Sequence, residues 1–189
     1  GGRFSLAGQN WTMTGVTFSN TATVQLIGSE TITGLTQDID SGTWDYVGDG
    51  DGLADTYTIK DWGATDYFNL TIAGVDNADL FQLSAATTVA GPTMTISSGI
   101  FNSVTYAVTF NSSSTQTLNT GGNTFYGLTH SGSGTLQLSG NALTVTNALT
   151  NSGGILSLNG QNLTATGATF SNTATMQLIG SETITGLTQ

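Results

Sequence analysis

The clearest candidate for chemistry in this sequence is an acidic, glycine-rich segment, Asp49-Gly-Asp-Gly-Leu-Ala-Asp55. Its carboxylates occupy positions 1, 3 and 7, and the glycines between them permit the tight turns that bring oxygen ligands around a hard cation. We therefore predict a metal site formed by Asp49, Asp51 and Asp55, with Ca²⁺ as the natural cation. The alternative is a solvated acidic loop, because Leu53 at position 5 and Lys60 at position 12 depart from the EF-hand spacing.

Two further groups of side chains lie near this segment. Asp38, Asp40 and Asp45 come from the preceding repeat unit, and we expect them to add ligands if successive loops stack. Six aromatic residues also gather here, which we interpret as packing residues, with a carbohydrate-stacking platform as the alternative. They are Trp44, Tyr46, Tyr57, Trp62, Tyr67 and Phe68.

The sequence contains no arrangement typical of nucleophilic or acid–base catalysis. There is no cysteine, and the one histidine, His130, stands in a turn-like context, where we predict a solvated side chain. Scattered serines do not by themselves define a Ser–His–Asp arrangement. We predict that the protein is not an enzyme.

The charge balance excludes some partners. The formal net charge is −10, with Arg3 and Lys60 as the only fixed cations. Nucleic-acid binding requires cations that neutralise phosphates, so we expect no nucleic-acid partner. No apolar run approaches the roughly 18 residues of a membrane-spanning helix, so we expect no membrane insertion in this segment.

The elements that must position these side chains are repeated. Residues 8–37 and 160–189 differ at only four of thirty positions, 152 residues apart. We interpret 1–189 as a single continuous domain with one period at 8–159 and the start of the next at 160–189. A repeat of this size is usually built from smaller units that stack on one another.

Glycine-rich turns divide the period into units of 19 to 25 residues, with longer, loop-bearing units at 48–120. Within a unit, apolar and polar residues alternate over three short stretches, as they do in strands with one buried face. The sequence therefore predicts an all-β fold, a parallel β-solenoid with about 20–25 residues and three short strands per coil. An antiparallel sandwich is the competing fold.

The four differences between the two copies are expected to face the interior, where neighbouring coils can adapt to a change of volume. They are Trp11/Leu163, Met13/Ala165, Val16/Ala168 and Val24/Met176. The outward threonines are unchanged. Their Thr-x-Thr pairs resemble the surface of some ice-binding proteins, which is a less favoured interpretation because the long units interrupt the face. The pairs are Thr12/Thr14, Thr31/Thr33, Thr93/Thr95, Thr144/Thr146, Thr164/Thr166 and Thr183/Thr185.

Two passages, LTVTNALTNSGGILSLNGQNLTATG and TWDYVGDGDGLADTYTIKDWGATDYFNLTIAG, carry a family resemblance. They resemble the tandem β-strand repeats of very large bacterial surface proteins, in the style of filamentous-haemagglutinin and autotransporter adhesins. The resemblance covers nearly the whole chain. It implies an extracellular or cell-surface location, a fibrous β-solenoid, and a role in adhesion, matrix or filament formation, and it implies no catalytic residue.

Together these observations predict a structural repeat segment of an extracellular fibre or filament on a microbial surface. Neither end of the pattern has a capping sequence, so we expect the rod to continue, either in a longer array or by end-to-end stacking of copies of itself. The alternative is an adhesin module that binds a surface glycan or a partner through the loops at 48–120.

Overall fold

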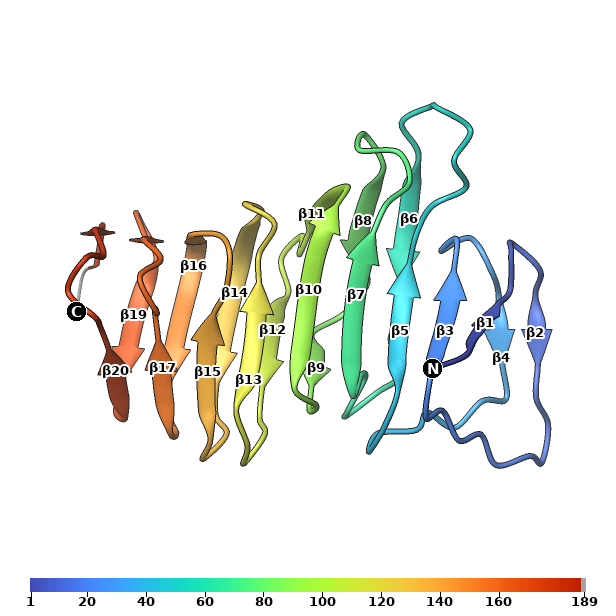
Figure 1. Ribbon diagram of the computed structural model, residues 1–189, viewed down its shortest axis with the longest axis horizontal. Helices are drawn as coiled ribbons and strands as arrows, with labels where there is room; N and C mark the ends of the chain where they lie inside the picture. Colours follow the sequence, from blue (N-terminus) through green and yellow to red (C-terminus); the bar gives the residue numbers. More distant parts are fainter. Residues whose placement is uncertain (188–189) are drawn as a thin grey trace.

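The computed structural model describes residues 1–187, which form a parallel β-solenoid (Figure 1). This range contains 21 strands and no helix, and therefore no helix long and apolar enough to cross a membrane. All strand pairings are parallel, which confirms the predicted fold and excludes the antiparallel sandwich. The last two residues of the second copy, 188 and 189, lie outside the described residues.

The strands form four sheets that run along the sides of the solenoid. Sheet one has nine strands, β1 (Arg3–Ser5), β3 (Thr23–Leu26), β5 (Thr43–Tyr46), β7 (Asn69–Ala73), β10 (Thr93–Ser98), β13 (Gln116–Asn119), β15 (Thr135–Leu138), β17 (Ile155–Ser157) and β20 (Thr175–Gln177). Sheet two has seven, β9 (Thr87–Val89), β12 (Ala107–Phe110), β14 (Thr124–His130), β16 (Leu143–Asn151), β18 (Leu163–Thr164), β19 (Thr169–Asn172) and β21 (Ile184–Thr185). The two smaller sheets contain β6 (Thr56–Ile59), β8 (Leu80–Leu83) and β11 (Ile100–Asn102), and β2 (Trp11–Thr12) and β4 (Ile32–Thr33).

The register of sheet one gives the length of each coil. Phe4 lies opposite Val24, 20 residues further on, whereas Trp44 lies opposite Leu70 after 26 residues and Leu70 opposite Met94 after 24. The longer coils thus fall where the sequence has its longer units. Three strands per coil are clearest in β7–β8–β9 and β10–β11–β12, whereas in β14 and β16 the second and third strands are joined, with an irregular register where they meet.

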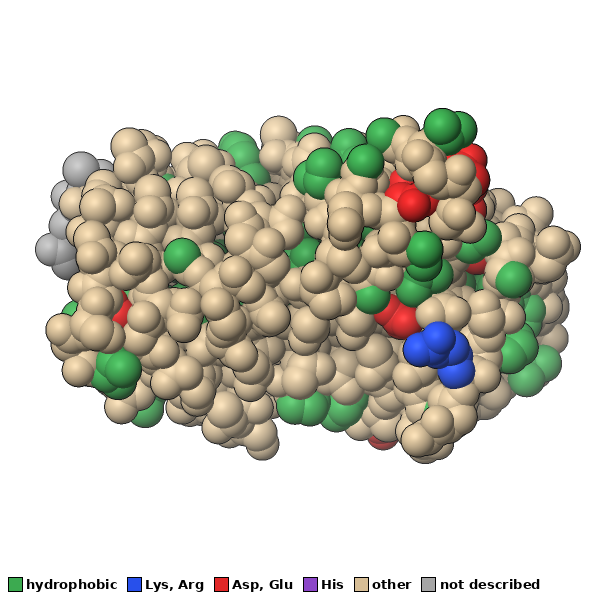
Figure 2. Space-filling model, turned by 45° about the horizontal axis from the view of Figure 1, so that its top comes forward, with side chains coloured by type: hydrophobic (Ala, Val, Ile, Leu, Met, Phe, Trp, Pro, Cys, Tyr) green, Lys and Arg blue, Asp and Glu red, His purple; other side chains and the backbone are tan. Residues whose placement is uncertain are grey.

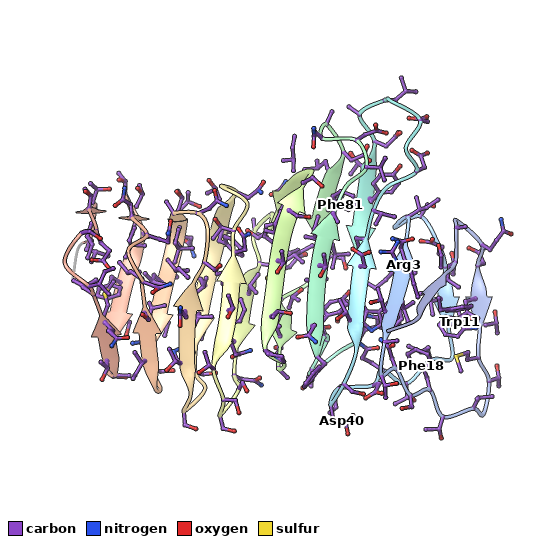
Figure 3. The ribbon with its side chains drawn as sticks, in the orientation of Figure 1. Arg3, Trp11, Phe18, Asp40 and Phe81 are labelled. Carbon is purple, nitrogen blue, oxygen red and sulfur yellow. The ribbon has the colours of Figure 1, made fainter. Side chains whose placement is uncertain are left out.

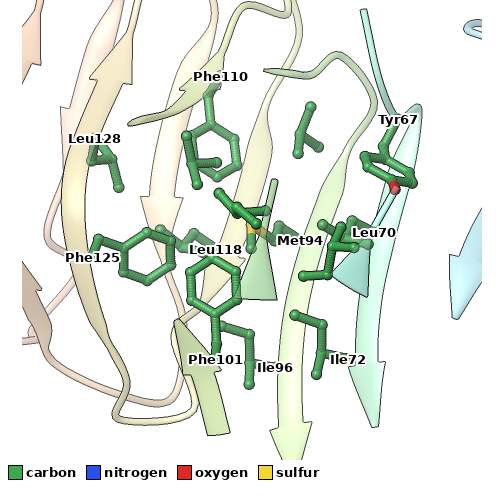
Figure 4. Close-up of a cluster of buried hydrophobic side chains, with 14 of the residues drawn as sticks. Tyr67, Leu70, Ile72, Met94, Ile96, Phe101, Phe110, Leu118, Phe125 and Leu128 are labelled. Atoms are coloured by element: carbon green, nitrogen blue, oxygen red, sulfur yellow. The ribbon is translucent and has the colours of Figure 1, made fainter. Parts of the chain in front are cut away.

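The interior is a stack of apolar rows, because parallel in-register pairing sets each inward side chain on its counterpart in the next coil. One row of sheet one is buried from Val24 to Leu138 and packs against the aromatic and aliphatic residues of the other sides (Figure 4). Its members are Val24, Trp44, Leu70, Met94, Leu118 and Leu138. The predicted alternation of inward apolar and outward polar residues is therefore the source of the core.

The prediction of a solvated His130 is wrong. The side chain lies in β14, fully buried, with Nδ1 2.9 Å from Oδ1 of Asn151 in the next coil. Asn151 in turn donates from Nδ2 to Oδ1 of Asn172, one coil further, at 2.8 Å. His130 therefore lies in a strand although its sequence is typical of a turn. Its inward-facing side chain is satisfied by Asn151 of the next coil, a hydrogen-bond partner that is distant in sequence.

The positions that differ between the copies are inward in the second copy, where Leu163, Ala165 and Ala168 are buried. In the first copy the prediction is wrong for Val16, which is exposed, and Trp11 is only half-buried. The reason is that the coil formed by residues 1–20 has a neighbouring coil on one side only.

Candidate cation site

The predicted acidic segment lies in a loop that projects from the rod between β5 and β6, residues 47–55 (Figure 1, upper right). The loop between β7 and β8, residues 74–79, lies beside it, because the two occupy the same corner of successive coils. The Val75 N–H donates a hydrogen bond of 2.7 Å to the Val47 carbonyl oxygen and so ties the two loops together. A site here is therefore built from two coils.

Glycine is required at the start of the first loop. Gly48 has φ of +72°, in the left-handed region that L side chains rarely adopt. A Cβ atom at this position would also collide with the carboxylate of Asp79. The backbone can approach that carboxylate only because the residue has no side chain.

Three carboxylates meet between the loops. Asp49, Asp51 and Asp76 each offer an oxygen, and these oxygens all lie within 4.8 Å of one another. Asp76 also accepts a hydrogen bond of 2.9 Å at Oδ2 from the Gly52 N–H, which holds it against the first loop. The structure thus gathers two of the three predicted residues and adds one from the next coil.

The third predicted residue, Asp55, lies outside that trio but within the same acidic group. Its N–H donates a hydrogen bond of 3.1 Å to Oδ1 of Asp79, whose side chain is fully buried and whose Oδ2 has no hydrogen-bond partner in the described chain. Desolvation, followed by the charges of Asp51, Asp49, Asp79 and Asp76, raises the pKa of Asp55. Burial likewise raises the pKa of Asp79. The pKa values of Asp55 and Asp79 are thus raised first by desolvation and then by the charges of the neighbouring carboxylates.

A hard cation fits this arrangement. Carboxylate oxygens are the ligands that Ca²⁺ and Mg²⁺ prefer, and Ca²⁺ tolerates the flexible geometry that two adjacent loops provide. The buried Oδ2 of Asp79 is an acceptor without a donor, which is costly in a protein interior. A bound cation would remove the repulsion that raises the pKa of Asp55.

The acids of the preceding coil do not contribute to this group. Asp38 accepts a hydrogen bond of 2.6 Å from the Asn20 N–H, and Asp45 accepts one of 3.1 Å from Nε2 of Gln25. Asp40 lies at the opposite side of the rod from the projecting loops (Figure 3). The expectation that these residues add ligands is therefore wrong, because they occupy other corners and sides of the coil.

Asp76 and Asp79 were not predicted as site residues, because they lie in the following unit rather than in the acidic segment or the unit before it. The number of residues in the coil would have predicted their position. With Thr43 opposite Asn69, the segment around Asp76 falls one coil above Asp49. Length differences between units thus decide which residues of neighbouring loops meet.

The aromatic residues near this site serve packing rather than presenting a flat platform. Trp44, Tyr46 and Tyr67 are fully buried, and the two tyrosine hydroxyls lie 2.8 Å apart in a hydrogen bond. Trp62 is half-buried, with its ring centroid 4.9 Å from that of Trp44. The projecting loops also expose the apolar side chains of Leu53 and Val75. Figure 2 shows apolar and acidic side chains close together on this part of the surface.

The Thr-x-Thr pairs contribute to a partial ladder on the outside of sheet two. Thr124, Thr144, Thr164 and Thr185 stand in register on four successive coils, and the hydroxyls of the last two lie 3.3 Å apart. The neighbouring strand β11 instead carries an exposed Ile100. The ladder is therefore limited to one part of the rod.

The comparisons with known proteins do not assign the chain to a family. No protein-family model matches it, and neither a curated protein nor a solved structure is significantly similar to it.

Proposed function

We propose that this chain is a structural segment of an extracellular fibre or filament at a microbial surface. The observation that carries the proposal is sheet one, in which nine parallel strands stack in register over a continuous apolar interior. The chain has few charged residues, 7% of the total, and is rich in threonine, serine and asparagine, which suits the surface of such a rod. The resemblance to tandem repeats of large surface proteins also supports the proposal.

The mechanism is mechanical. Backbone hydrogen bonds between coils run along the axis, so axial strain is shared by parallel ladders on all sides, while the stacked side chains inside exclude water. Eight steps of about 4.8 Å between the nine strands of sheet one give an axial length of roughly 38 Å. The rod is extended by adding coils.

Electron microscopy and solution scattering test this function. Elongated particles with an axial repeat of about 4.8 Å are expected. Compact particles without that repeat would contradict the rod. Deletion of residues 48–55 distinguishes the alternative adhesin function, because loss of glycan or partner binding from an intact rod would favour an adhesin that uses the projecting loops.

We also propose that Ca²⁺ bridges the projecting loops through Asp49, Asp51 and Asp76. This is supported by the convergence of their oxygens and by the buried acceptor of Asp79 beside them. Calorimetric titration with Ca²⁺ should show one binding event that Asp76→Asn weakens strongly. Asp61→Asn is the matched control, since Asp61 is exposed and outside the trio. Equal affinity in both variants would refute the site.

A further inference from the structure

Large apolar side chains are exposed on one side of the middle coils. Between residues 47 and 160, all of them lie in the three-stranded sheet of β6, β8 and β11, called sheet three below, or in the loops beside it. They are Leu53, Val75, Ile100 and Val104. The strands of sheet one in these coils, β5, β7 and β10, are each paired on both edges. The exposure is therefore a property of the side of the rod.

The outer face of sheet three carries two adjacent aliphatic side chains. Thr56 lies opposite Leu80, and Leu80 lies opposite Ile100. Leu80 is half-buried and Ile100 is 48% exposed, whereas the next residue of each strand is buried in the core. Because paired strands lie about 4.8 Å apart, Leu80 and Ile100 stand side by side. Apolar side chains gathered on one exposed face are typical of an interaction surface.

The projecting loops present aliphatic and acidic side chains together. Val75 is 66% exposed and lies against the first loop, since a Cβ atom at Gly50 would be 3.2 Å from its Cγ1. Leu53 is 64% exposed, and its N–H donates a hydrogen bond of 2.8 Å to Oδ1 of Asp51. Apolar and acidic side chains are accordingly close together on this part of the surface (Figure 2).

The carboxylates of these loops have no fixed cation of the chain in the same loops. Arg3 lies in β1, and Lys60 follows β6 at the end of that strand away from residues 47–55. Asp79 adds a second, independent sign of a missing partner. Its side chain is fully buried, and its Oδ2 faces Gly48 of the first loop with no hydrogen-bond partner among the described residues. Positive charge at this corner must come from outside the chain.

We propose that this surface binds a basic segment of a partner protein, whose lysine or arginine side chains contact the acidic loops while its apolar side chains cover Leu80 and Ile100. The proposal names a partner for the alternative adhesin function and does not rest on the rod function. It shares Asp49, Asp51 and Asp76 with the proposed Ca²⁺ site, so the partner and Ca²⁺ compete.

Charge complementarity selects this partner over others. An anionic membrane would bring phosphates towards carboxylates, and a second copy of this surface would bring carboxylates together, so both are repelled. A neutral glycan would gain nothing from the charges. A basic segment with apolar side chains gains both from burial of the aliphatic side chains and from neutralisation of the acidic loops.

Synthetic peptides test the chemistry of the partner by fluorescence anisotropy at low salt and without Ca²⁺. The probe is a labelled peptide of alternating lysine and leucine. A lysine–serine peptide has the same charge without apolar side chains, and a glutamate–leucine peptide has the opposite charge. The lysine–leucine peptide should bind at least about tenfold more tightly than either. Equal binding of either comparison peptide would overturn the proposal.

A pair of isoleucine variants tests the place of binding. Ile100→Ser should weaken binding of the lysine–leucine peptide about fivefold, because about half of this side chain is left for the partner to bury. Ile39→Ser is the matched control. Ile39 is 51% exposed and precedes Asp40, on the opposite side of the rod from the loops (Figure 3). Equal weakening in both variants would overturn the proposed surface, and circular dichroism checks that each retains its β-fold.

A pair of aspartate variants separates local charge from net charge. Asp51→Asn should weaken binding of both lysine peptides about threefold, as expected for one exposed ion pair. Asp61→Asn makes the same change of net charge at another exposed position and should have no effect. Equal weakening in both variants would show attraction to the net charge alone and would overturn the proposal.

Competition with Ca²⁺ distinguishes this inference from the proposed functions. Saturating Ca²⁺ should weaken binding of the lysine–leucine peptide, because it neutralises the shared carboxylates. A chain that binds this peptide but no Ca²⁺ would support the surface and refute the Ca²⁺ site. Binding to phosphatidylglycerol vesicles instead of the peptide would overturn the proposal in favour of a membrane. The rod is judged by its axial repeat and this surface by peptide affinity, so failure of either is recognised separately.

Discussion

Glu30→Ala is expected to destabilise the first coils by about 3 kcal/mol. The carboxylate is fully buried and accepts N–H groups from Gly8, Ile27 and Gly28 at 3.0, 2.9 and 2.8 Å. An unsatisfied buried donor costs about 1–3 kcal/mol. Only the bond from Gly28 is fully buried and the other two are partly buried, so the total is well below three full penalties.

Glu182→Ala is the matched control, because the equivalent three donors surround a carboxylate that is only half-buried. Gly160, Ile179 and Gly180 can bond to water after the substitution, so the loss of stability should be a small fraction of that at Glu30. The two sites have the same local sequence and hydrogen-bond geometry. The difference between the variants therefore measures the effect of burial alone.

Native-state hydrogen exchange is the suitable assay, since repeat proteins open coil by coil and a single unfolding midpoint can hide a local change. The amides of Gly8, Ile27 and Gly28 should lose protection in Glu30→Ala, whereas the equivalent amides change little in Glu182→Ala. Equal loss in both variants, or unchanged protection at Gly28, would refute the reasoning from burial.

Three further outcomes are expected. A chelator should lower the melting temperature of the wild type in calcium but leave Asp51→Asn unchanged, with about 2.7 kcal/mol at stake when Ca²⁺ is at 100 times its Kd. Backbone hydrogen bonds, led by that from Ile179, lower the pKa of Glu182 to about 2 from its ordinary value of 4.5. Its contribution to stability should therefore be complete above pH 4.5 and be lost as the pH falls towards 2, which exchange of the Ile179 amide at each pH would measure. Gly154→Ala should destabilise the protein more than Gly122→Ala by chemical denaturation, because both have positive φ but only at Gly154 would a Cβ atom strike the backbone of the neighbouring coil.

The fold could be predicted from the sequence because its information is local and repeated. Alternation of apolar and polar residues with period 2, interrupted by turn residues at about 20-residue intervals, specifies strands, their inward faces and their stacking. Leu118 and its neighbours in the apolar row follow from this pattern directly. Even the projecting loops were visible as extra length in the units at 48–120.

Part of the candidate site could be predicted on the same basis. Asp49 and Asp51 meet because they share one glycine-rich loop, whose geometry is local. Asp76 lies beside them only because β5 and β7 pair with an offset of 26 residues. Asp55 lies outside this group of three, and its N–H donates a hydrogen bond to the buried Asp79. Which residues of neighbouring coils meet depends on the total number of residues in the strands and loops of one coil. A local sequence pattern does not contain that number.

At some positions burial was decided by the tertiary structure and not by the local sequence. Glu30 and Glu182 have the same neighbours in sequence, yet Glu30 is fully buried beneath the following coil and Glu182 is only half-buried. His130 stands in a sequence typical of a turn, yet its coil places it inside, against Asn151. The sequence by itself determined which residues alternate and repeat, whereas the number of coils stacked on either side determined what each of them touches.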